Sequence, residues 1–135
     1  MKRVLVLCTG NSCRSIIAEA LINAELKGVL AQSAGSRPKG SVHPYAKKLL
    51  QTKGIWQEGY RSKGIEEVSG RFDLVVSVCD DAKEACPTLP GVKALHIPFD
   101  DPDGKEYEAF EKTFEQIRRK LLPKIEDELG LGQKE

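Results

Sequence analysis

The chain has 135 residues and a formal net charge of +1 at pH 7, and 30% of its residues are charged. This length suits one domain with one hydrophobic core, and the balanced charge gives no overall attraction to nucleic acid or to a membrane. The apolar run after Met1-Lys2-Arg3 is too short for the core of a signal peptide or for a membrane span. We therefore expect a cytoplasmic protein whose four cysteines serve catalysis, redox cycling or metal binding instead of a structural disulfide framework.

The elements predicted from hydrophobic periodicity alternate along the chain. Strands are expected over residues 4–7, 30–34, 72–78 and 94–97, and helices over residues 15–27, 44–53 and 108–129. Pro123 should kink or split the last helix, because proline has no N–H group to donate. The alternation predicts a single three-layer α/β domain over residues 1–130, with a four-stranded parallel sheet and helices on both faces, and a tail at residues 131–135. A ligand would then bind at the carboxyl ends of the strands.

The segment Cys8-Thr9-Gly10-Asn11-Ser12-Cys13-Arg14-Ser15 directly follows the first predicted strand. Cys8 and Arg14 can bracket a loop whose backbone N–H groups turn inward around an oxyanion, and the next helix points its positive end at the same place. Arg14 offers a bidentate fork to two oxygens, and the positive field favours the thiolate of Cys8. A strand end that merely buries Cys8 would not account for Arg14, so this segment predicts an anion site with a nucleophilic thiol.

The remaining residues of this segment have supporting roles in the same interpretation. The Ser15 hydroxyl can donate to the thiolate, Gly10 permits a tight turn, and Asn11 can bond across the loop. Cys13 is expected to be structural and to face the core. The residues predicted to surround the oxyanion are Thr9, Gly10, Asn11, Ser12, Cys13, Arg14 and Ser15.

Two further cysteines lie near the end of the third predicted strand. Cys79 follows that strand, and Cys86 comes seven residues later. On a helix the two thiols would share one side at a separation of about 10 Å, whereas a disulfide needs Cα atoms within about 7 Å, so bridging them requires the turn to unwind. The pair is therefore either a redox switch or a buried strand end and an unrelated surface thiol. The spacing, which lacks a Cys-x-x-Cys pair, argues against zinc.

Acidic residues precede the last helix. Asp100-Asp101-Pro102 is an ordinary turn sequence, and it is also a place for a proton donor beside the anion loop. We favour Asp101 over Asp100 because Asp101 directly precedes the proline. His43, before Pro44, is expected to cap or pack against a helix and not to act as a base.

Residues 8–15, followed by Ala18-Glu19-Ala20, resemble the phosphate-binding loop of the low-molecular-weight protein tyrosine phosphatase superfamily. Within it, Val78-Cys79-Asp80, Ala85-Cys86-Pro87 and residues 99–106 are similar to the thioredoxin-coupled arsenate reductases. The similarity runs from the first strand to the last helix. It implies the phosphatase-like fold with flavodoxin-like strand order.

The resemblance also implies a reaction, the reduction of arsenate to arsenite in arsenic detoxification. Cys8 attacks arsenate while Asp101 protonates the departing oxygen, Cys79 attacks the sulfur of Cys8, and Cys86 then attacks Cys79. The final disulfide is reduced by thioredoxin, or by glutaredoxin with glutathione. No bound cofactor is implied, phosphate and sulfate would compete with arsenate, and the protein is expected to be a monomer.

One departure concerns a cation. In some arsenate reductases of this branch an asparagine, a glutamate, a serine and an aspartate hold potassium, and Asn11, Glu19 and Ser33 match the first three. Lys63 stands where the aspartate would be, so its ammonium group could replace the ion. We therefore assign no metal.

Two other functions remain open. A tyrosine phosphatase would need only Cys8, Arg14 and Asp101, but phosphatases of this superfamily carry aromatic residues after the acidic Asp-Pro, where this chain has Asp103-Gly104-Lys105. A weak phosphatase side activity is compatible with the pattern. A non-catalytic oxyanion or redox sensor would bind the anion without consuming reductant.

Overall fold

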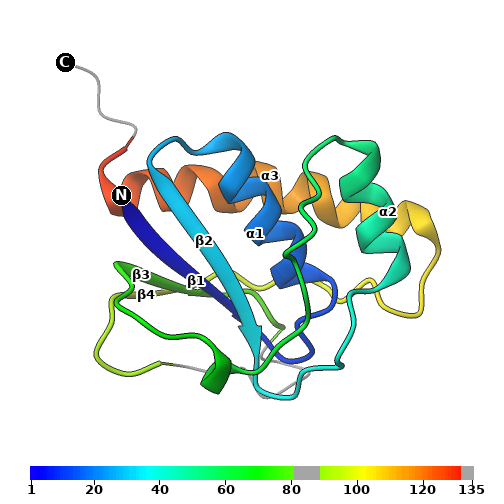
Figure 1. The fold of residues 1–135 in the computed structure, drawn as a ribbon. Coiled ribbons are helices and arrows are strands. Elements are labelled where there is room, and N and C mark those ends of the chain that lie inside the picture. The colour runs from blue at the N-terminus through cyan, green and yellow to red at the C-terminus, as the bar shows by residue number, and fades with distance from the viewer. Residues whose placement is uncertain (81–88, 132–135) are drawn as a thin grey trace.

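The computed structural model describes residues 1–80 and 89–131 of the chain (Figure 1). Every strand and helix predicted from the sequence is present, with bounds that differ by a few residues. The elements are the strands β1 (Lys2–Cys8), β2 (Val29–Gly35), β3 (Leu74–Ser77) and β4 (Ala94–His96), the helices α1 (Arg14–Glu25), α2 (Pro44–Thr52) and α3 (Tyr107–Leu129), and the 3-10 helix η1 (Ile65–Glu67).

The strands form a parallel sheet in the order β2-β1-β3-β4. This is the α/β fold with flavodoxin-like order that the sequence predicts. The register pairs Cys8 with Gly35 of β2 and Leu7 with Ser77 of β3. The carboxyl end of β1 therefore lies between the carboxyl ends of β2 and β3, and the chain segments that follow these strands start at one edge of the sheet.

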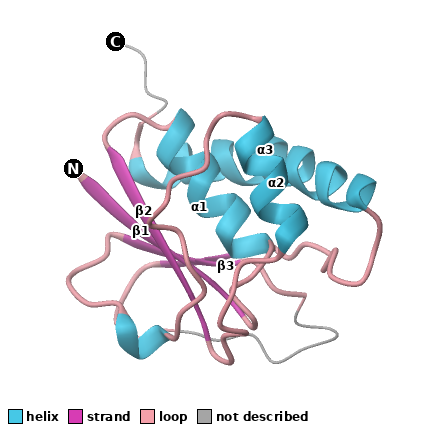
Figure 2. Cartoon of the chain, turned by 45° about the vertical axis from the view of Figure 1, so that its right-hand side comes forward, coloured by secondary structure: helices cyan, strands magenta, loops and turns pink. Residues whose placement is uncertain are grey.

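The two faces of the sheet are covered differently. Val4 and Val6 of β1 point into a core shared with all three α-helices, which lie on one side of the sheet (Figures 1 and 2). Leu5 and Leu7 face the other way and meet η1 and neighbouring loop side chains. The sequence predicts helices on both faces, whereas in the described residues the second face carries only this one short 3-10 turn. Apolar side chains of η1 and of the loops on either side of β3 cover that face, namely Ile65, Val68, Phe72, Leu89 and Val92.

Helix α3 runs through Pro123 as one element, so the predicted split does not occur. Proline inside a helix costs about 3 kcal/mol. Leu121, Leu122 and Ile125 on both sides of it are buried in the core, and each fully buried aliphatic side chain contributes about 1.5–3 kcal/mol. Packing therefore outweighs the lost hydrogen bond. The helix ends at Gly130, which adopts the left-handed conformation with φ 71°.

The predicted tail begins with a residue that belongs to the fold. Leu131 packs against the core and its N–H group donates to the carbonyl of Glu126 at 2.8 Å. Residues 132–135 lie outside the described part of the chain. No helix within residues 1–80 and 89–131 has the length and apolar character needed to cross a membrane.

Candidate active site

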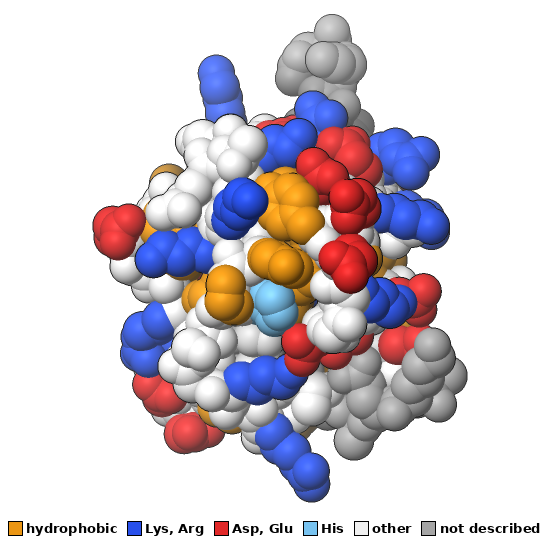
Figure 3. All heavy atoms as spheres, turned by 90° about the vertical axis from the view of Figure 1, so that its right-hand side faces the viewer, with side chains coloured by type: hydrophobic (Ala, Val, Ile, Leu, Met, Phe, Trp, Pro, Cys, Tyr) orange, Lys and Arg blue, Asp and Glu red, His pale blue; other side chains and the backbone are white. Residues whose placement is uncertain are grey.

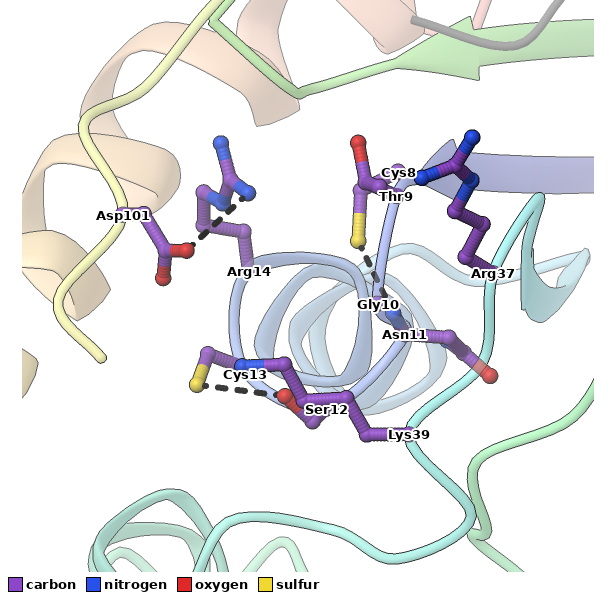
Figure 4. Close-up of a pocket in the computed structure, with 10 residues that line it drawn as sticks. All are labelled: Cys8, Thr9, Gly10, Asn11, Ser12, Cys13, Arg14, Arg37, Lys39 and Asp101. Carbon is purple, nitrogen blue, oxygen red and sulfur yellow. Dashed lines mark hydrogen bonds and ion pairs between the residues drawn. The ribbon is translucent and has the colours of Figure 1, made fainter. Parts of the chain in front are cut away.

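A pocket of about 250 Å³ opens at the carboxyl end of β1 (Figure 4). Cys8 is the last residue of this strand and Arg14 is the first residue of α1, so the segment between them is the turn from strand to helix. The pocket therefore lies where the sequence analysis expects an anion. It is lined by Cys8, Thr9, Gly10, Asn11, Ser12, Cys13, Arg14, Arg37, Lys39 and Asp101.

The sulfur of Cys8 lies at the base of this loop and is almost fully buried. The backbone N–H of Asn11 donates to it at 3.3 Å, and the Ser15 hydroxyl lies 3.1 Å away. Asn11 reaches this position with φ 48°, the left-handed region that L-residues rarely adopt, and in the described ranges no other non-glycine residue does so. The loop thus bends so that a backbone N–H group and a hydroxyl group both contact one thiol.

The side chain of Asn11 fastens the loop to its surroundings. Its amide nitrogen donates to the hydroxyl of Ser15 at 2.7 Å and to the hydroxyl of Ser33 at 2.9 Å. Its oxygen accepts from the backbone N–H of Lys63 at 2.8 Å. One buried side chain therefore connects the loop, β2 and the segment before η1, as the sequence analysis expects of Asn11.

Glu19 and Lys63 lie in the same buried region. The Ser33 hydroxyl donates to Glu19 at 2.5 Å. Burial raises the pKa of Glu19 to about 7, against the opposing effects of the Ser33 bond and the Lys63 charge. Burial also lowers the pKa of Lys63, which the charge of Glu19 opposes. We call Asn11, Ser15, Glu19, Ser33 and Lys63 the rear network. The Lys63 ammonium group is therefore near enough to Glu19 for the two charges to interact.

Gly35 allows the neighbouring strand to approach the loop closely. It pairs with Cys8 in the register of β1 and β2, and a Cβ atom at this position would lie 2.5 Å from the carbonyl oxygen of Thr9. Real Cβ atoms essentially never come so close to another heavy atom. A residue without a side chain is therefore required where β2 ends.

The guanidinium group of Arg14 is buried at the side of the pocket. One of its nitrogens donates to the carbonyl of Phe99 at 3.1 Å, and another lies 3.5 Å from a carboxylate oxygen of Asp101. The side chain of Asp101 is 43% exposed, so it stands at the mouth of the pocket. Asp100, in contrast, lines a separate hollow beside Lys105. The geometry brings together the predicted nucleophile, the predicted anion-binding arginine and the favoured aspartate.

Cys13 is the second thiol of the loop, and it is buried. Burial raises the pKa of Cys13 to about 12, so this thiol stays neutral and is a poor nucleophile at physiological pH. This agrees with the structural role expected from the sequence.

Cys79 is fully buried just beyond the end of β3. The preceding residue, Val78, donates its N–H to the carbonyl of Leu7 at 2.9 Å, so Cys79 and Cys8 lie at the carboxyl ends of neighbouring strands. Cys79 takes part in a disulfide, whereas Cys8 and Cys13 are free thiols. The predicted relay residue Cys86 lies outside the described residues.

Two basic residues of the pocket were missed by the sequence analysis. Arg37 and Lys39 follow β2 and line the pocket with Arg14. Their position after a strand adjacent to β1 was the available signal, because side chains beyond neighbouring parallel strand ends share one edge. His43, as expected, caps α2: its Nδ1 accepts from the N–H of Tyr45 at 3.0 Å.

Comparisons with known proteins agree with this geometry. An arsenate reductase of Staphylococcus aureus (strain N315) is 38% identical over 120 residues, which are 87% of this chain and 91% of the relative. The crystal structure of arsenate reductase from Archaeoglobus fulgidus has a TM-score of 0.81 and 30% identity, covering 90% of this chain and 98% of that chain. A structure described as an arsenate reductase in the phosphate binding state has a TM-score of 0.78 and 28% identity, covering 94% and 98%.

The family model for low molecular weight phosphotyrosine protein phosphatases matches residues 3–130, almost the whole chain. This match includes the strand, the cysteine–arginine loop and the helix that carry the resemblance seen in the sequence. The chain therefore belongs to the low molecular weight phosphotyrosine protein phosphatase family.

Proposed function

We propose that this protein reduces arsenate to arsenite through a thiol relay in which Cys8 is the nucleophile and Cys79 and Cys86 follow in turn. The observation that carries the proposal is the pairing of two features: a buried thiol at the base of a cationic pocket, and a second, oxidisable cysteine after the adjacent strand. The relatives named arsenate reductase support the choice of oxyanion.

Binding of arsenate follows from the charges and donors of the pocket. Arsenate is tetrahedral and anionic like phosphate, and Arg14, Arg37 and Lys39 line the cavity together with the strand-to-helix turn. The N-terminal end of α1 attracts an anion through its N–H groups and its dipole, and no acidic residue in the first turn opposes this attraction. The neighbour described in the phosphate binding state supports a site for anions of this shape.

The first chemical step forms a bond between sulfur and arsenic. The Cys8 thiolate attacks arsenate, and one arsenic–oxygen bond breaks. Asp101, in its protonated form, gives its proton to the departing oxygen, which leaves as water. Its position beside Arg14, at the mouth of the pocket, supports this role.

The second step moves two electrons to arsenic. Cys79, as a thiolate, attacks the sulfur of Cys8; a disulfide forms and the electron pair of the sulfur–arsenic bond passes to arsenic, which leaves as trivalent arsenite. Cys86 then attacks Cys79 by thiol–disulfide exchange and frees Cys8. A protein in which Cys79 is oxidised while Cys8 is a free thiol is the form expected after this exchange. An external dithiol such as thioredoxin would reduce the final disulfide.

The proposal is tested by arsenate-dependent oxidation of NADPH in the presence of thioredoxin and thioredoxin reductase, with glutaredoxin plus glutathione as a parallel arm. We expect turnover with thioredoxin and none when arsenate is omitted. Oxidation of NADPH that requires glutaredoxin would identify glutaredoxin as the reductant and would still support arsenate reduction. No arsenate-dependent oxidation with either system would refute arsenate reduction.

Cysteine variants distinguish the relay from simpler chemistry. Cys79→Ser and Cys86→Ser should each abolish multiple turnover, and Cys86→Ser should still release arsenite once and trap a Cys8–Cys79 disulfide that peptide mass mapping detects. Normal cycling of Cys86→Ser would exclude the exchange step.

Phosphate-ester hydrolysis is a second candidate, because Cys8, Arg14 and Asp101 also form the set that a phosphatase needs. Water would then resolve a phosphocysteine, and neither Cys79 nor Cys86 would take part. Hydrolysis of p-nitrophenyl phosphate that survives Cys79→Ser and Cys86→Ser would reveal this activity. A sensor, by comparison, would bind the oxyanion and oxidise no NADPH.

A further inference from the structure

The loop that carries Asp101 is joined to the far wall of the pocket by charged side chains. This acid loop, residues 97–106, connects β4 to α3, and the β2–α2 loop, residues 36–43, forms the facing wall. The carboxylate of Asp103 pairs with the ammonium group of Lys39, and its other oxygen lies 3.4 Å from Nε2 of His43. The two loops are therefore connected through one aspartate.

The histidine end of this connection is fixed by the fold. Nδ1 of His43 accepts the N–H of Tyr45, so the hydrogen of the neutral ring is on Nε2, which faces Asp103. The ring of His43 also packs on Phe110 of α3, with 4.6 Å between ring centroids. Figure 3 shows this side of the molecule, where charged side chains of both signs adjoin an apolar patch that contains a histidine.

The lysine end is fixed against the anion loop, residues 8–15, which joins β1 to α1. The N–H of Lys39 donates to the carbonyl of Gly10 at 3.0 Å. Its aliphatic carbons lie 3.2–3.4 Å from the point where a Cβ atom of residue 10 would be, so the stem of the lysine rests against Gly10. Lys39 thus extends from the β2–α2 loop, past Gly10, toward the acid loop, and its bond lowers the pKa of Asp103, which keeps that carboxylate charged.

Asp103 in turn contacts the predicted proton donor. Its backbone N–H donates to one carboxylate oxygen of Asp101 at 3.0 Å, while the other oxygen of Asp101 lies 3.5 Å from Arg14. Whatever holds Asp103 in place therefore also orients the carboxyl group of Asp101.

We propose that the Lys39–Asp103 ion pair, flanked by the ring of His43, forms a latch that holds the acid loop against the pocket and positions Asp101 for proton transfer. The three are positioning residues, and the role of Asp101 rests on the proposed function. The side chains of Lys39 and Asp103 are 50% and 34% exposed, and exposed ion pairs are weak. The latch can therefore open easily. The acid loop needs this freedom, because an anion must enter the pocket and a product must leave it.

The latch is tested first without any reaction, by amide hydrogen exchange of the acid loop in the anion-free protein. Lys39→Met and Asp103→Asn should each accelerate exchange in this loop about two- to five-fold, the factor expected for losing an exposed ion pair. Lys105→Met is the matched control: it removes a lysine of the same loop that forms no ion pair with the described residues, and exchange should stay as in the parent. Equal exchange in the parent and in both latch variants would overturn the proposal.

A kinetic double-variant test distinguishes positioning from a merely structural role. Asp103→Asn should lower kcat for arsenate reduction about two- to five-fold, in line with the small energy of such a pair, and leave KM nearly unchanged. In the Asp101→Asn background the same change should have no further effect, because the group that it positions is gone. An equal loss in both backgrounds would refute positioning. If the parent fails to reduce arsenate, the proposed function fails while the exchange experiment still decides the latch.

Discussion

The rear network holds the anion loop and the latch holds the acid loop, and the two lie in different environments. Ser33, Glu19 and Lys63 in the rear network are 0%, 5% and 8% exposed, whereas Lys39 and Asp103 of the latch are 50% and 34% exposed at the side chain. A buried polar group left without its partner costs about 1–3 kcal/mol, whereas an exposed ion pair contributes about 0–1 kcal/mol. The molecule therefore fixes the side that orients Cys8 and leaves the side that carries Asp101 adjustable.

The largest expected effect comes from Cys8, which lies between these two regions. Cys8→Ser should abolish arsenate reduction, because the attacking sulfur is gone, while the walls continue to bind anions. Sulfate affinity, measured by isothermal titration calorimetry, should stay within about three-fold of the parent, since the backbone donors and Arg14 remain. If the variant reduces arsenate at the parent rate, Cys8 is not the nucleophile.

Arg14 contacts Asp101 on the adjustable side, and its substitution should have the second-largest effect. Arg14→Lys replaces a planar fork with a point charge that cannot hold two oxygens at once. Losing a charge-assisted hydrogen bond of about 1.5–3 kcal/mol should lower kcat/KM for arsenate about 10- to 100-fold. Near-normal kcat/KM would remove Arg14 from the binding site.

A stability measurement tests the comparison directly. Asn11→Ala removes the side-chain bonds to Ser15, Ser33 and Lys63 and leaves alanine in a left-handed conformation, so the free energy of unfolding in urea should fall by about 2–4 kcal/mol. Lys39→Met, the matched change in the latch, should alter it by less than about 1 kcal/mol. Similar losses in the two variants would show that the regions do not differ as described.

The raised pKa of Glu19 predicts a dependence of stability on pH. Its carboxyl group has a pKa of about 7 in the folded protein and 4.5 when unperturbed, so the folded state holds a proton that the unfolded chain has released. The free energy of unfolding should therefore fall as pH rises from about 4.5 to about 7, by up to about 3 kcal/mol.

Glu19→Gln supplies the control for this slope, because glutamine keeps the shape and does not titrate. Urea unfolding at several pH values from 4.5 to 8 should show a difference between parent and variant that changes up to about pH 7 and then levels off. The lowered pKa of Lys63 contributes only at more alkaline pH. There the free energy of unfolding should rise with pH up to the unperturbed pKa of 10.5, because the folded protein loses this proton before the unfolded chain does. A pH-independent difference would exclude a titrating Glu19.

The smallest expected effect concerns potassium. If the Lys63 ammonium group replaces a cation beside Asn11 and Glu19, potassium in place of sodium at constant ionic strength should leave turnover of the parent nearly unchanged. Lys63→Asp should create a potassium response, because a carboxylate then completes an oxygen-rich site. Strong stimulation of the parent by potassium would refute the replacement.

The anion loop could be predicted from the sequence because its chemistry is contiguous. Cys8, Asn11 and Arg14 fall within one turn that joins an apolar strand to a helix, so no distant contact is needed to recognise it. The latch could not be predicted in this way. Lys39 and Asp103 are 64 positions apart, and each belongs to a segment that is an ordinary polar turn by composition.

The fold shows the same limit in its packing. The strand order followed from the alternation of elements and the family resemblance, but the covering of the second face did not, since no helix or strand is predicted for the segment that holds Ile65 and Val68. The continuity of α3 through Pro123 depends on burial of its neighbours, which a local rule for proline does not include.

Gly35 shows how the sheet itself determines where the anion site lies. Parallel strands stand about 4.8 Å apart, and at the end of β2 that interval is filled by the backbone of Thr9 instead of a side chain. The start of the anion loop is thus held against β2 by backbone contact, at the position that strand pairing gives it. The place of the site at the end of β1 is consequently a property of the scaffold, and it should persist in variants whose loop side chains have been changed.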